Sequence, residues 1–305
     1  MAQARILRIY LEKSEMERAR DGNYNLMNRI KSAFEWQGFR VEFMRDSLEQ
    51  RLKSAGRRGY SLFFMHDPFH DRALTLRRSY FFPYWRIEST AERWAFDVAQ
   101  KSFDPGETEP DQAREWADRW RGWLFKGAAR EPVRDGSVYV PLQGRLLERR
   151  RFQEKSPLDM LRDVAEHDPE RQIIVGLHPK ERYSDEEKAG LETVLAKNPH
   201  MHLKRGGMRA ALKSCDYVVT ENSSAALFGF FFHKPAILYA RIDFHHIGLN
   251  VRDLGVGEAF ARAESHRPDF DTYLYWFIHQ NSIKADAEDA EDQILAAVRR
   301  HGWQV

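Results

Sequence analysis

Two short segments constrain the fold of this chain more than any others. They are QIIVGL, at residues 172–177, and DYVVT, at residues 216–220, and both are almost continuously apolar or β-branched. A strand with one solvated face alternates apolar and polar residues, whereas near-continuous runs are typical of strands buried on both faces. Such strands occur in parallel sheets that helices cover on both sides. The two segments therefore predict an α/β fold.

Strand-like and helix-like segments alternate along the rest of the chain. In the first part ARILRIYL, RVEFM and YSLFFMHDP are typical of strands, and NYNLMNRIKSAFEWQGF is typical of a helix. A second series follows residues 126–136, where KGAAREPVRDG combines glycine, proline and charge without periodicity, as linkers do. We therefore predict two Rossmann-like domains with parallel sheets, residues 1–130 and residues 131–305, the second with C-terminal helices.

Three tryptophans before this linker lie at helical spacing. Trp116, Trp120 and Trp123 stand in EPDQAREWADRWRGWLF. This spacing predicts an amphipathic helix with one buried face, in preference to a platform on which bases stack.

Composition narrows the compartment and the partners. The 305 residues include 48 basic and 46 acidic side chains, so a net charge of +2 does not indicate a nucleic-acid partner. The single cysteine, Cys215, excludes an internal disulfide and suits a reducing cytosol. MAQARILRIYLEKSE carries charges where a signal peptide needs an apolar core, and AALFGFFF is too short to cross a bilayer. We expect a soluble cytoplasmic protein. Peripheral contact with the inner face of the cell membrane stays open, because Trp and Tyr favour interfaces.

A histidine and a proline directly follow the first buried strand. Pro179 fixes its own φ and so holds the exit from the strand, where the imidazole of His178 can donate a hydrogen bond to an anionic oxygen. Lys180, the next residue, can add positive charge. A purely structural turn is the alternative interpretation.

Polar residues also follow the second buried strand. Glu221 and Asn222 lead to Ser223 and Ser224, where a helix is predicted to begin. Serines at this position cap free backbone N–H groups, and the same groups, with the helix dipole, attract anions. Both loops leave strands of one predicted sheet at the same end, so we expect them to lie close together.

Two further loops carry candidate ligand-binding side chains. His245, His246, Gly248 and Arg252 follow the strand PAILYA, and Gln143 ends the strand VYVPL. Paired histidines invite a metal site, but no carboxylate or thiolate at a familiar spacing completes one, either here or around His66 and His70. We therefore predict no metal. Gln143 is followed by a basic run that predicts either a solvated face or a surface for an anionic substrate or headgroup: Arg145, Arg149, Arg150 and Arg151.

Taken in order, five segments resemble the capsule polysaccharide biosynthesis family, whose characterised members are glycosyltransferases that use CMP-Kdo. The segments are VYVPLQ, IIVGLHP, DYVVTENSSAALFGFFFHKPAILY, DFHHIGLNVRD and YLYWFI, and the resemblance covers residues 137–283. It implies a GT-B fold, in which two Rossmann-like domains face a central cleft and the N-terminal domain is on the acceptor side. It also implies that the nucleotide's phosphate is held by His178, Ser223 and Ser224, beside Gln143, Pro179, Lys180, Glu221 and Asn222.

The resemblance implies a metal-independent glycosyltransferase. Its donor would be a CMP-activated, Kdo-like sugar, bound as substrate with no cofactor, and its acceptor a cell-surface polysaccharide or glycolipid precursor. The physical chemistry agrees, because an imidazole, hydroxyls, backbone N–H groups and cations can stabilise a departing phosphate.

The catalytic acids depart from the family pattern. Family members carry acidic residues shortly after the glutamine, whereas QGRLLERRR offers only Glu148. Asp67, at the end of the strand SLFFMHDP, is a second candidate base, with Glu88 behind it; a turn-stabilising role before Pro68 is the alternative for Asp67. Two other functions therefore stay open. One is a CDP-glycerol-type glycerophosphotransferase, which shares the His–Pro and Ser–Ser segments. The other is an inactive GT-B relative that only binds nucleotide or glycan.

Overall fold

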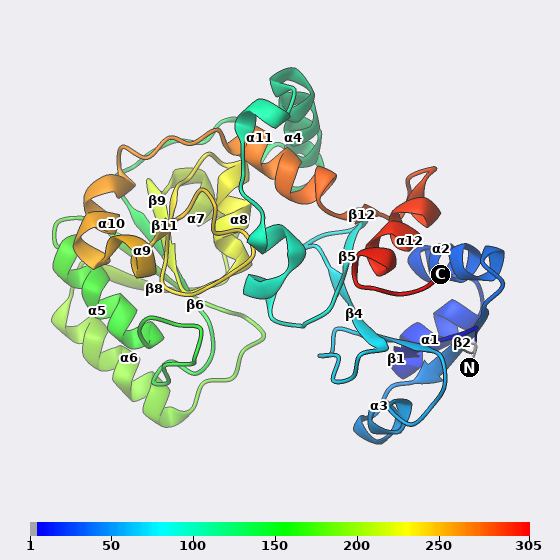
Figure 1. Cartoon of the computed structure of the whole chain (residues 1–305). Coiled ribbons are helices and arrows are strands. Elements are labelled where there is room, and N and C mark those ends of the chain that lie inside the picture. The colour runs from blue at the N-terminus through cyan, green and yellow to red at the C-terminus, as the bar shows by residue number, and fades with distance from the viewer. Residues whose placement is uncertain (1–4) are drawn as a thin grey trace. The chain divides into compact units, whose positions relative to one another are not determined.

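The computed structural model describes residues 5–305 and contains two compact units (Figure 1). The first unit comprises the described residues up to Lys101 together with Phe277–Val305, and the second comprises Ser102–Trp276. This division differs from the predicted boundary after residue 130 in two ways. Residues 102–130 belong to the second unit, and the C-terminal residues return to the first.

The first unit is built on a mixed six-stranded sheet. The strand order is β12-β5-β4-β3-β1-β2. Neighbours among β1 to β4 are parallel, whereas β5 is antiparallel to β4 and β12 is antiparallel to β5. The prediction of a parallel sheet is therefore correct for the neighbouring strands β1 to β4 and wrong for β5, which runs against both of its neighbours. The strands are β1 (Ile6–Leu11), β2 (Arg40–Arg45), β3 (Tyr60–Phe64), β4 (Ala73–Arg78), β5 (Tyr84–Glu88) and β12 (Ile283–Lys284).

Helices of both chain ends cover this sheet. Its helices are α1 (Lys13–Arg20), α2 (Asn25–Trp36), α3 (Leu48–Ser54) and α12 (Ala290–Arg300), with 3₁₀ turns at Arg93–Ala95 and Asp97–Gln100. Helix α2 buries residues at helical spacing, Leu26, Ile30, Ala33 and Phe34. Trp303, just after α12, stacks on Tyr60 of β3 with ring centroids 4.3 Å apart. This packing explains why the C-terminal residues belong to the first unit.

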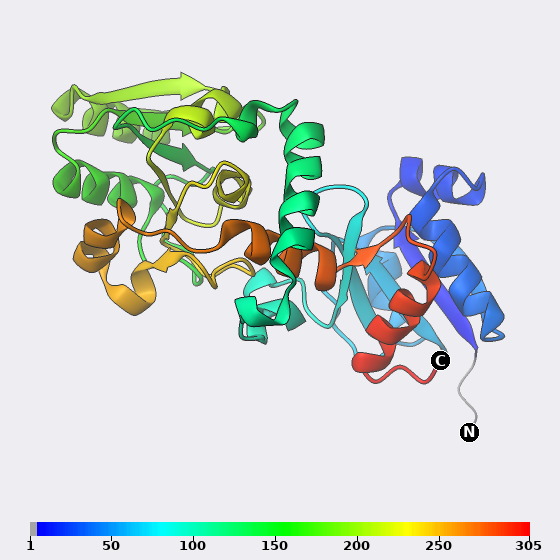
Figure 2. The ribbon, with the colours of Figure 1, turned by 90° about the horizontal axis from the view of Figure 1, so that it is seen from above.

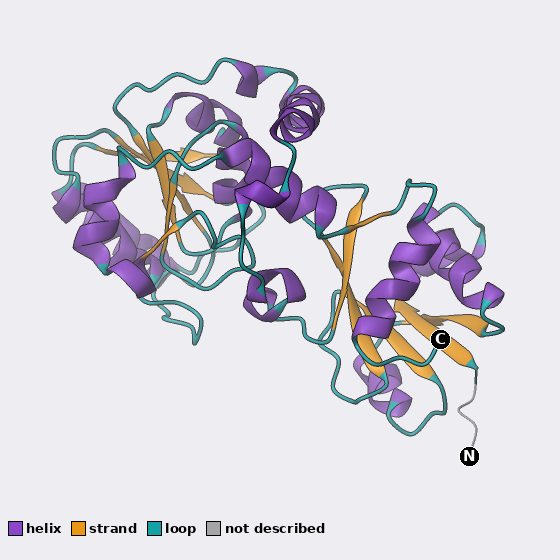
Figure 3. Cartoon of the chain, turned by 45° about the horizontal axis from the view of Figure 1, so that its top comes forward, coloured by secondary structure: helices purple, strands orange, loops and turns teal. Residues whose placement is uncertain are grey.

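The second unit contains a fully parallel six-stranded sheet (Figure 3). Its order is β11-β10-β9-β6-β7-β8, so numbered along the unit the strands run 6-5-4-1-2-3. This is the Rossmann order, and the chain reverses its direction across the sheet between β6 and β9. The strands are β6 (Val138–Leu142), β7 (Ile173–Leu177), β8 (Met201–Arg205), β9 (Tyr217–Thr220), β10 (Ala236–Leu238) and β11 (Leu249–Asn250).

The two segments that predicted the fold, β7 and β9, are interior strands of this sheet, each with a neighbour on either side. Strand β9 is buried along its whole length, and in β7 only Ile174 is partly exposed. The covering helices are α5 (Pro157–His167), α6 (Asp185–Lys197), α7 (Met208–Ser214), α8 (Ser224–Phe231), α9 (Val251–Leu254) and α10 (Val256–Ala263). The unit also holds α4 (Pro110–Phe125), 3₁₀ turns at Pro105–Glu107 and Ala128–Arg130, and α11 (Phe270–Leu274), from which the π-helical turn Tyr275–Gln280 continues.

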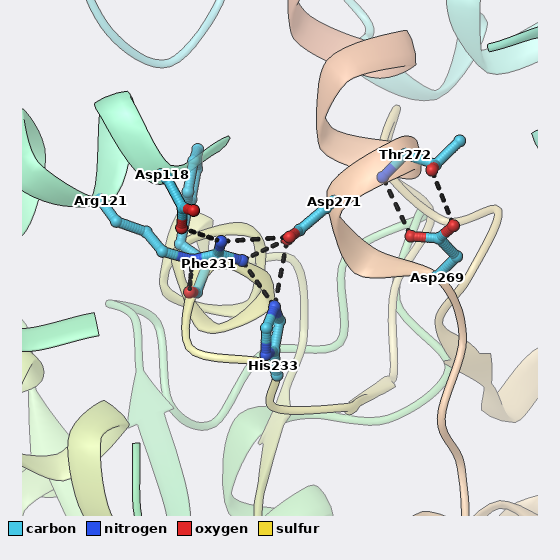
Figure 4. A network of polar contacts seen from close by, with 7 residues as sticks. All are labelled: Asp118, Arg121, Phe231, His233, Asp269, Asp271 and Thr272. Atoms are coloured by element: carbon cyan, nitrogen blue, oxygen red, sulfur yellow. Dashed lines mark hydrogen bonds and ion pairs between the residues drawn. The ribbon is translucent and has the colours of Figure 1, made fainter. Parts of the chain in front are cut away.

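An arginine ties α4 to the second unit (Figure 4). Arg121 is almost fully buried; its Nε donates to the Phe231 carbonyl at 2.8 Å, and its guanidinium pairs with Asp271 of α11. His233 completes the cluster, with Nε2 3.1 Å from Asp271 Oδ1. Figures 1 and 2 show α4 (green) and α11 (orange) crossing each other. A buried guanidinium needs such partners, so α4 cannot belong to the first unit.

Helix α4 has one buried face, as predicted, but not all of its tryptophans are buried. Trp116 is 6% exposed and packs against Phe231 and Tyr275, whereas Trp123 is 63% exposed. The two are seven residues apart on one side of the helix, but the covering rings reach only the first. Within residues 5–305, no helix combines the length and the apolar character needed to cross a membrane.

Candidate nucleotide-binding site

The reversal between β6 and β9 brings two predicted residues to one edge of the sheet. Gln143 directly follows β6 and Glu221 directly follows β9. The two strands are hydrogen-bonded neighbours, and the Thr220 hydroxyl donates to the Pro141 carbonyl at 3.1 Å. In open α/β sheets, ligands bind outside the carboxyl ends of the strands at such a reversal.

His178 directly follows the next strand, β7, and backbone hydrogen bonds fix its position. The Lys180 backbone N–H donates to His178 Nδ1 at 3.3 Å, and the His178 backbone N–H donates to the Tyr183 hydroxyl at 3.1 Å. Because Nδ1 accepts a hydrogen bond, the neutral imidazole carries its proton on Nε2. The side chain is exposed, and no residue in the described part of the chain bonds Nε2. His178 therefore presents a free N–H donor, with Pro179 and Lys180 forming the turn.

The loops that follow β6 and β7 touch each other. A Cβ atom added to Gly144 would lie 2.7 Å from Glu181 Oε2, and the Leu146 N–H donates to Glu187 Oε1 at 2.5 Å. The structure thus brings the Gln143 and His178 loops together. The sequence predicted proximity of the His178 and Ser223 loops instead; both leave the same edge of the sheet, with β6 between their strands β7 and β9. Tyr183 and Glu187, which hold the Gln143 and His178 loops, were not among the predicted residues, although Ser184 and Glu187 have the spacing of the capping box that begins α6.

The serine pair begins α8 at the same edge. Ser223 is the N-cap, and its Oγ accepts the Ala225 N–H at 3.2 Å. Ser224 is the first helical residue, and it is partly exposed like Asn222 and Ser223. The Ser223 cap uses one acceptor position and leaves the hydroxyl proton available as a donor. Capping and anion binding are therefore compatible here.

Glu221 is the most unusual side chain of the site. It is 1% exposed, and burial raises the pKa of its carboxyl to about 8, because the Arg150 guanidinium and the Gln153 amide only partly offset the lost hydration. Neither carboxyl oxygen makes a hydrogen bond of ordinary geometry with any residue from 5 to 305. The buried Oε1 of Gln143 is likewise without such a partner. Near neutral pH Glu221 is thus an uncharged carboxyl that can both donate and accept.

The arginine-rich loop after Gln143 closes over Glu221. Gln153, 2% exposed, pairs with Ala240 in an isolated antiparallel bridge and accepts the Arg150 N–H at 2.7 Å through Oε1. Glu148, the acid proposed as catalytic, is exposed and lies 3.3 Å from Arg145 Nη1. An exposed carboxylate beside a guanidinium on its own turn has no environment that would prepare it as a base.

The third loop places its histidines against aromatic residues. His245 and His246 stack with ring centroids 4.2 Å apart, and His246 Nδ1 lies 3.1 Å from the Tyr273 hydroxyl. Gly248 is required by close packing, since a Cβ there would lie 2.6 Å from Leu238 Cδ1. Arg252 is exposed in α9, at the carboxyl end of β11. Of the four, Arg252 lies closest in sequence to the carboxyl end of a strand, two residues after β11.

The acids of the first unit lie in separate environments. Asp67 is exposed on the loop between β3 and β4, and its Oδ1 accepts the Ala91 N–H at 2.7 Å. Glu88 is 3% exposed, and burial raises its pKa to about 7. It pairs with Thr75 near the start of β4, which is the amino edge of the parallel strands and not the carboxyl edge. Glu88 therefore lies away from the edge where ligands of such sheets bind.

Glu88, Asp97 and His301 form the one group in residues 5–305 whose donor atoms could together reach a metal ion. His301 Nε2 lies 3.1 Å from the Ile87 carbonyl, and Asp97 pairs with Arg300 at 3.1 Å. Asp97 Oδ2 and His301 Nε2 thus already have partners within the protein. The histidines singled out in the sequence are also engaged: His66 lies 3.2 Å from Asp46, and His70 lies 2.8 Å from the Ser54 hydroxyl.

Comparison with known proteins supports the fold assignment. No protein-family model and no curated protein sequence matches the chain. Among solved structures, the KpsC β-Kdo 2,7 transferase of Thermosulfurimonas dismutans is similar, with 14% identity and a TM-score of 0.51 over 96% of this chain and 99% of that one. The KpsC β-Kdo 2,4 transferase of the same organism has 10% identity and a TM-score of 0.48 over 90% of each chain. A UDP-GlcNAc 2-epimerase of Neisseria meningitidis has 10% identity and a TM-score of 0.36 over 97% of this chain and 99% of that one.

The first of these structures has the same fold as this chain over nearly the full length of both. The α/β, GT-B-like fold with two Rossmann-like units, predicted from the sequence, is therefore confirmed. The resemblance to the capsule polysaccharide biosynthesis family is matched at the level of the fold.

Proposed function

We propose that this protein is a glycosyltransferase that uses a CMP-activated, Kdo-like sugar to extend a cell-surface polysaccharide or glycolipid precursor. The observation that carries the proposal is the Nε2–H donor of His178, beside the reversal of a Rossmann sheet where Gln143 and the start of α8 also lie. The fold shared with a β-Kdo 2,7 transferase supports it. The single, buried cysteine suits a cytoplasmic reaction.

The proposed chemistry is stabilisation of the departing nucleotide. As the bond between the sugar and CMP breaks, negative charge grows on the phosphate. His178 Nε2–H would donate to a phosphate oxygen, and the first N–H groups of α8 and the Ser223 hydroxyl would donate to others. Lys180 and Arg252, both exposed, add positive charge. We assign the uncharged carboxyl of Glu221 and the amide of Gln143 to neutral hydrogen-bonding groups of the donor.

A non-catalytic nucleotide- or glycan-binding protein is the second candidate. The observation that favours it is the exposed pair of Glu148 with Arg145, since the loop then offers no prepared catalytic acid. Asp67 does not replace it on present geometry, because its carboxylate already accepts the Ala91 N–H.

Calorimetric titration with CMP, CMP-Kdo, CDP-glycerol and UDP separates these possibilities. We expect CMP and CMP-Kdo to bind, and His178→Ala to weaken CMP by ~1.5–3 kcal/mol, the contribution of a hydrogen bond to a charged group. His202→Ala is the matched control, because His202 is also exposed in this unit but bonds Gln172 at the start of β7. Preferred binding of CDP-glycerol would instead indicate a glycerophosphotransferase.

Failure of CMP and CMP-Kdo to bind at millimolar concentration would disprove the proposal. Turnover of CMP-Kdo with a synthetic acceptor then distinguishes an active transferase from a binding protein.

A further inference from the structure

The C-terminal half of α4 carries an exposed aromatic and cationic surface. We name this surface, made of Trp120, Trp123, Arg119, Lys126 and Arg130, the α4 patch. Trp123 is 63% exposed, and its ring meets Trp120 edge-on with centroids 5.3 Å apart. Arg119 and Lys126 lie four residues before and three residues after Trp123, which places all three on one side of the helix.

The charges of the α4 patch are of one sign. No acidic residue occurs between Arg119 and Arg130, whereas Asp111, Glu115 and Asp118 all lie earlier in the helix. Asp118 is also engaged by Arg121 at 2.9 Å. Arg119, Lys126 and Arg130 are exposed and make no ion pair within residues 5–305. The Arg130 guanidinium instead lies over the helix, 3.2 Å from where a Cβ on Gly122 would be.

Packing does not require this exposure. Trp116, on the same side of α4, is covered by Phe231 and Tyr275, but the only ring that Trp123 contacts among the described residues is Trp120. An indole ring that stays in water gains no hydrophobic stabilisation, whereas burial in a membrane or a partner would provide it.

We propose that the α4 patch docks the protein on an anionic lipid surface. Indole rings are favoured at the boundary between headgroups and acyl chains, where one side is apolar and the other wet. Three uncompensated cations beside them are attracted to anionic headgroups. A protein partner would need a shaped complement, whereas a lipid surface needs only this combination of indole and positive charge. The proposal is independent of the nucleotide site.

Co-sedimentation with vesicles tests the proposal. We expect the full chain to bind equimolar phosphatidylglycerol–phosphatidylcholine vesicles, to bind pure phosphatidylcholine weakly, and to release at high salt. Trp123→Ala should lower the partition coefficient about tenfold. Arg119→Gln and Lys126→Gln should each lower it about fivefold.

Trp36→Ala is the matched control. Trp36 is 75% exposed on α2, where the nearby Lys31 is neutralised by Glu35 at 2.7 Å, so its loss should leave vesicle binding unchanged. A melting temperature unchanged from the wild type reports that each variant is folded. The proposal is overturned if the folded protein ignores anionic vesicles, or if Trp123→Ala and Trp36→Ala change binding equally.

Discussion

At the scale of single residues, the sequence identified several polar groups of the site, but it did not reveal that Glu221 is buried. Gln143, His178 and Ser223 were predicted from their positions after buried strands, and the structure has them at strand ends of one sheet. Glu221 was predicted only as a neighbour of the serines. Its burial depends on Arg150 and Gln153, which reach it from a loop about seventy residues earlier in the chain. Sequence reasoning has no access to such a contact.

Glu221 should make stability fall as pH rises. Its pKa is about 8 in the folded protein against an ordinary value of 4.5, so the folded state holds a proton that the unfolded state loses. The contribution of Glu221 to the free energy of unfolding is therefore fully present below about pH 4.5. It decreases by about 1.4 kcal/mol per pH unit until about pH 8. Glu221→Gln keeps the shape of the uncharged carboxyl but cannot lose a proton, so it removes this decrease in stability. We expect the variant to gain thermal stability relative to the wild type between pH 5 and pH 8.

Glu88→Gln serves as the comparison, because the pKa of Glu88 is also raised by burial, but to about 7. The difference in melting temperature between Glu88→Gln and the wild type should stop growing about one pH unit below the point at which that of Glu221→Gln does. If the difference in melting temperature between Glu221→Gln and the wild type did not depend on pH, the carboxyl would not be held uncharged.

At the scale of elements, alternation of hydrophobic segments predicted the strands and helices better than their directions. Strands β6 to β10 follow the predicted α/β alternation, and all are parallel, as is β11, which the sequence did not predict. In the first unit, β5 runs antiparallel to both of its neighbours, β4 and β12, because a short turn joins β4 to β5. The apolar pattern of a strand is the same in either direction, so it could not distinguish parallel from antiparallel pairing.

A glycine inside β7 supports the His178 loop. A Cβ on Gly176 would lie 2.9 Å from the ring of Tyr139 on β6, which is buried and cannot move aside freely. We expect Gly176→Ala to lower the free energy of unfolding by ~1–3 kcal/mol, as overpacking does. It should also weaken CMP binding, since Gly176 is two residues before His178. Chemical denaturation and calorimetric titration measure the two effects.

Gly257→Ala is the control for this substitution. Gly257 lies in α10 with open space around its Cα, so alanine there should raise stability by ~0.5–1 kcal/mol. Equal effects of the two substitutions would show that the contact with Tyr139 does not limit the strand.

At the scale of the whole molecule, the chain leaves the first unit at Lys101 and returns to it at Phe277. The predicted boundary, after residue 130, rested on the glycine- and proline-containing segment 126–136. This segment lies inside the second unit. Lys126 and Gly127 there end α4 in the left-handed conformation, with φ of 51° and 79°. Helix ends and domain linkers use the same residue types, so composition alone could not distinguish them.

Trp303 should therefore stabilise the first unit without affecting nucleotide binding by the second. Trp303→Ala removes the stack on Tyr60 and the edge contact with Phe34, at an expected ~3–5 kcal/mol. Scanning calorimetry should show one transition at lower temperature, while added CMP still raises the other. A loss of CMP affinity in this variant would contradict the assignment of the C-terminal residues to the first unit.

The sequence by itself determined the α/β class, the two Rossmann-like units and the strand ends at which polar side chains gather. These properties depend on the period and continuity of apolar residues, which are local. Only the tertiary structure decided the strand order that unites Gln143 with Glu221, the burial that leaves Glu221 uncharged, the exposure of Trp123 and the return of the chain to its first unit. Each of these depends on contacts between residues far apart in the chain, and no local pattern records them.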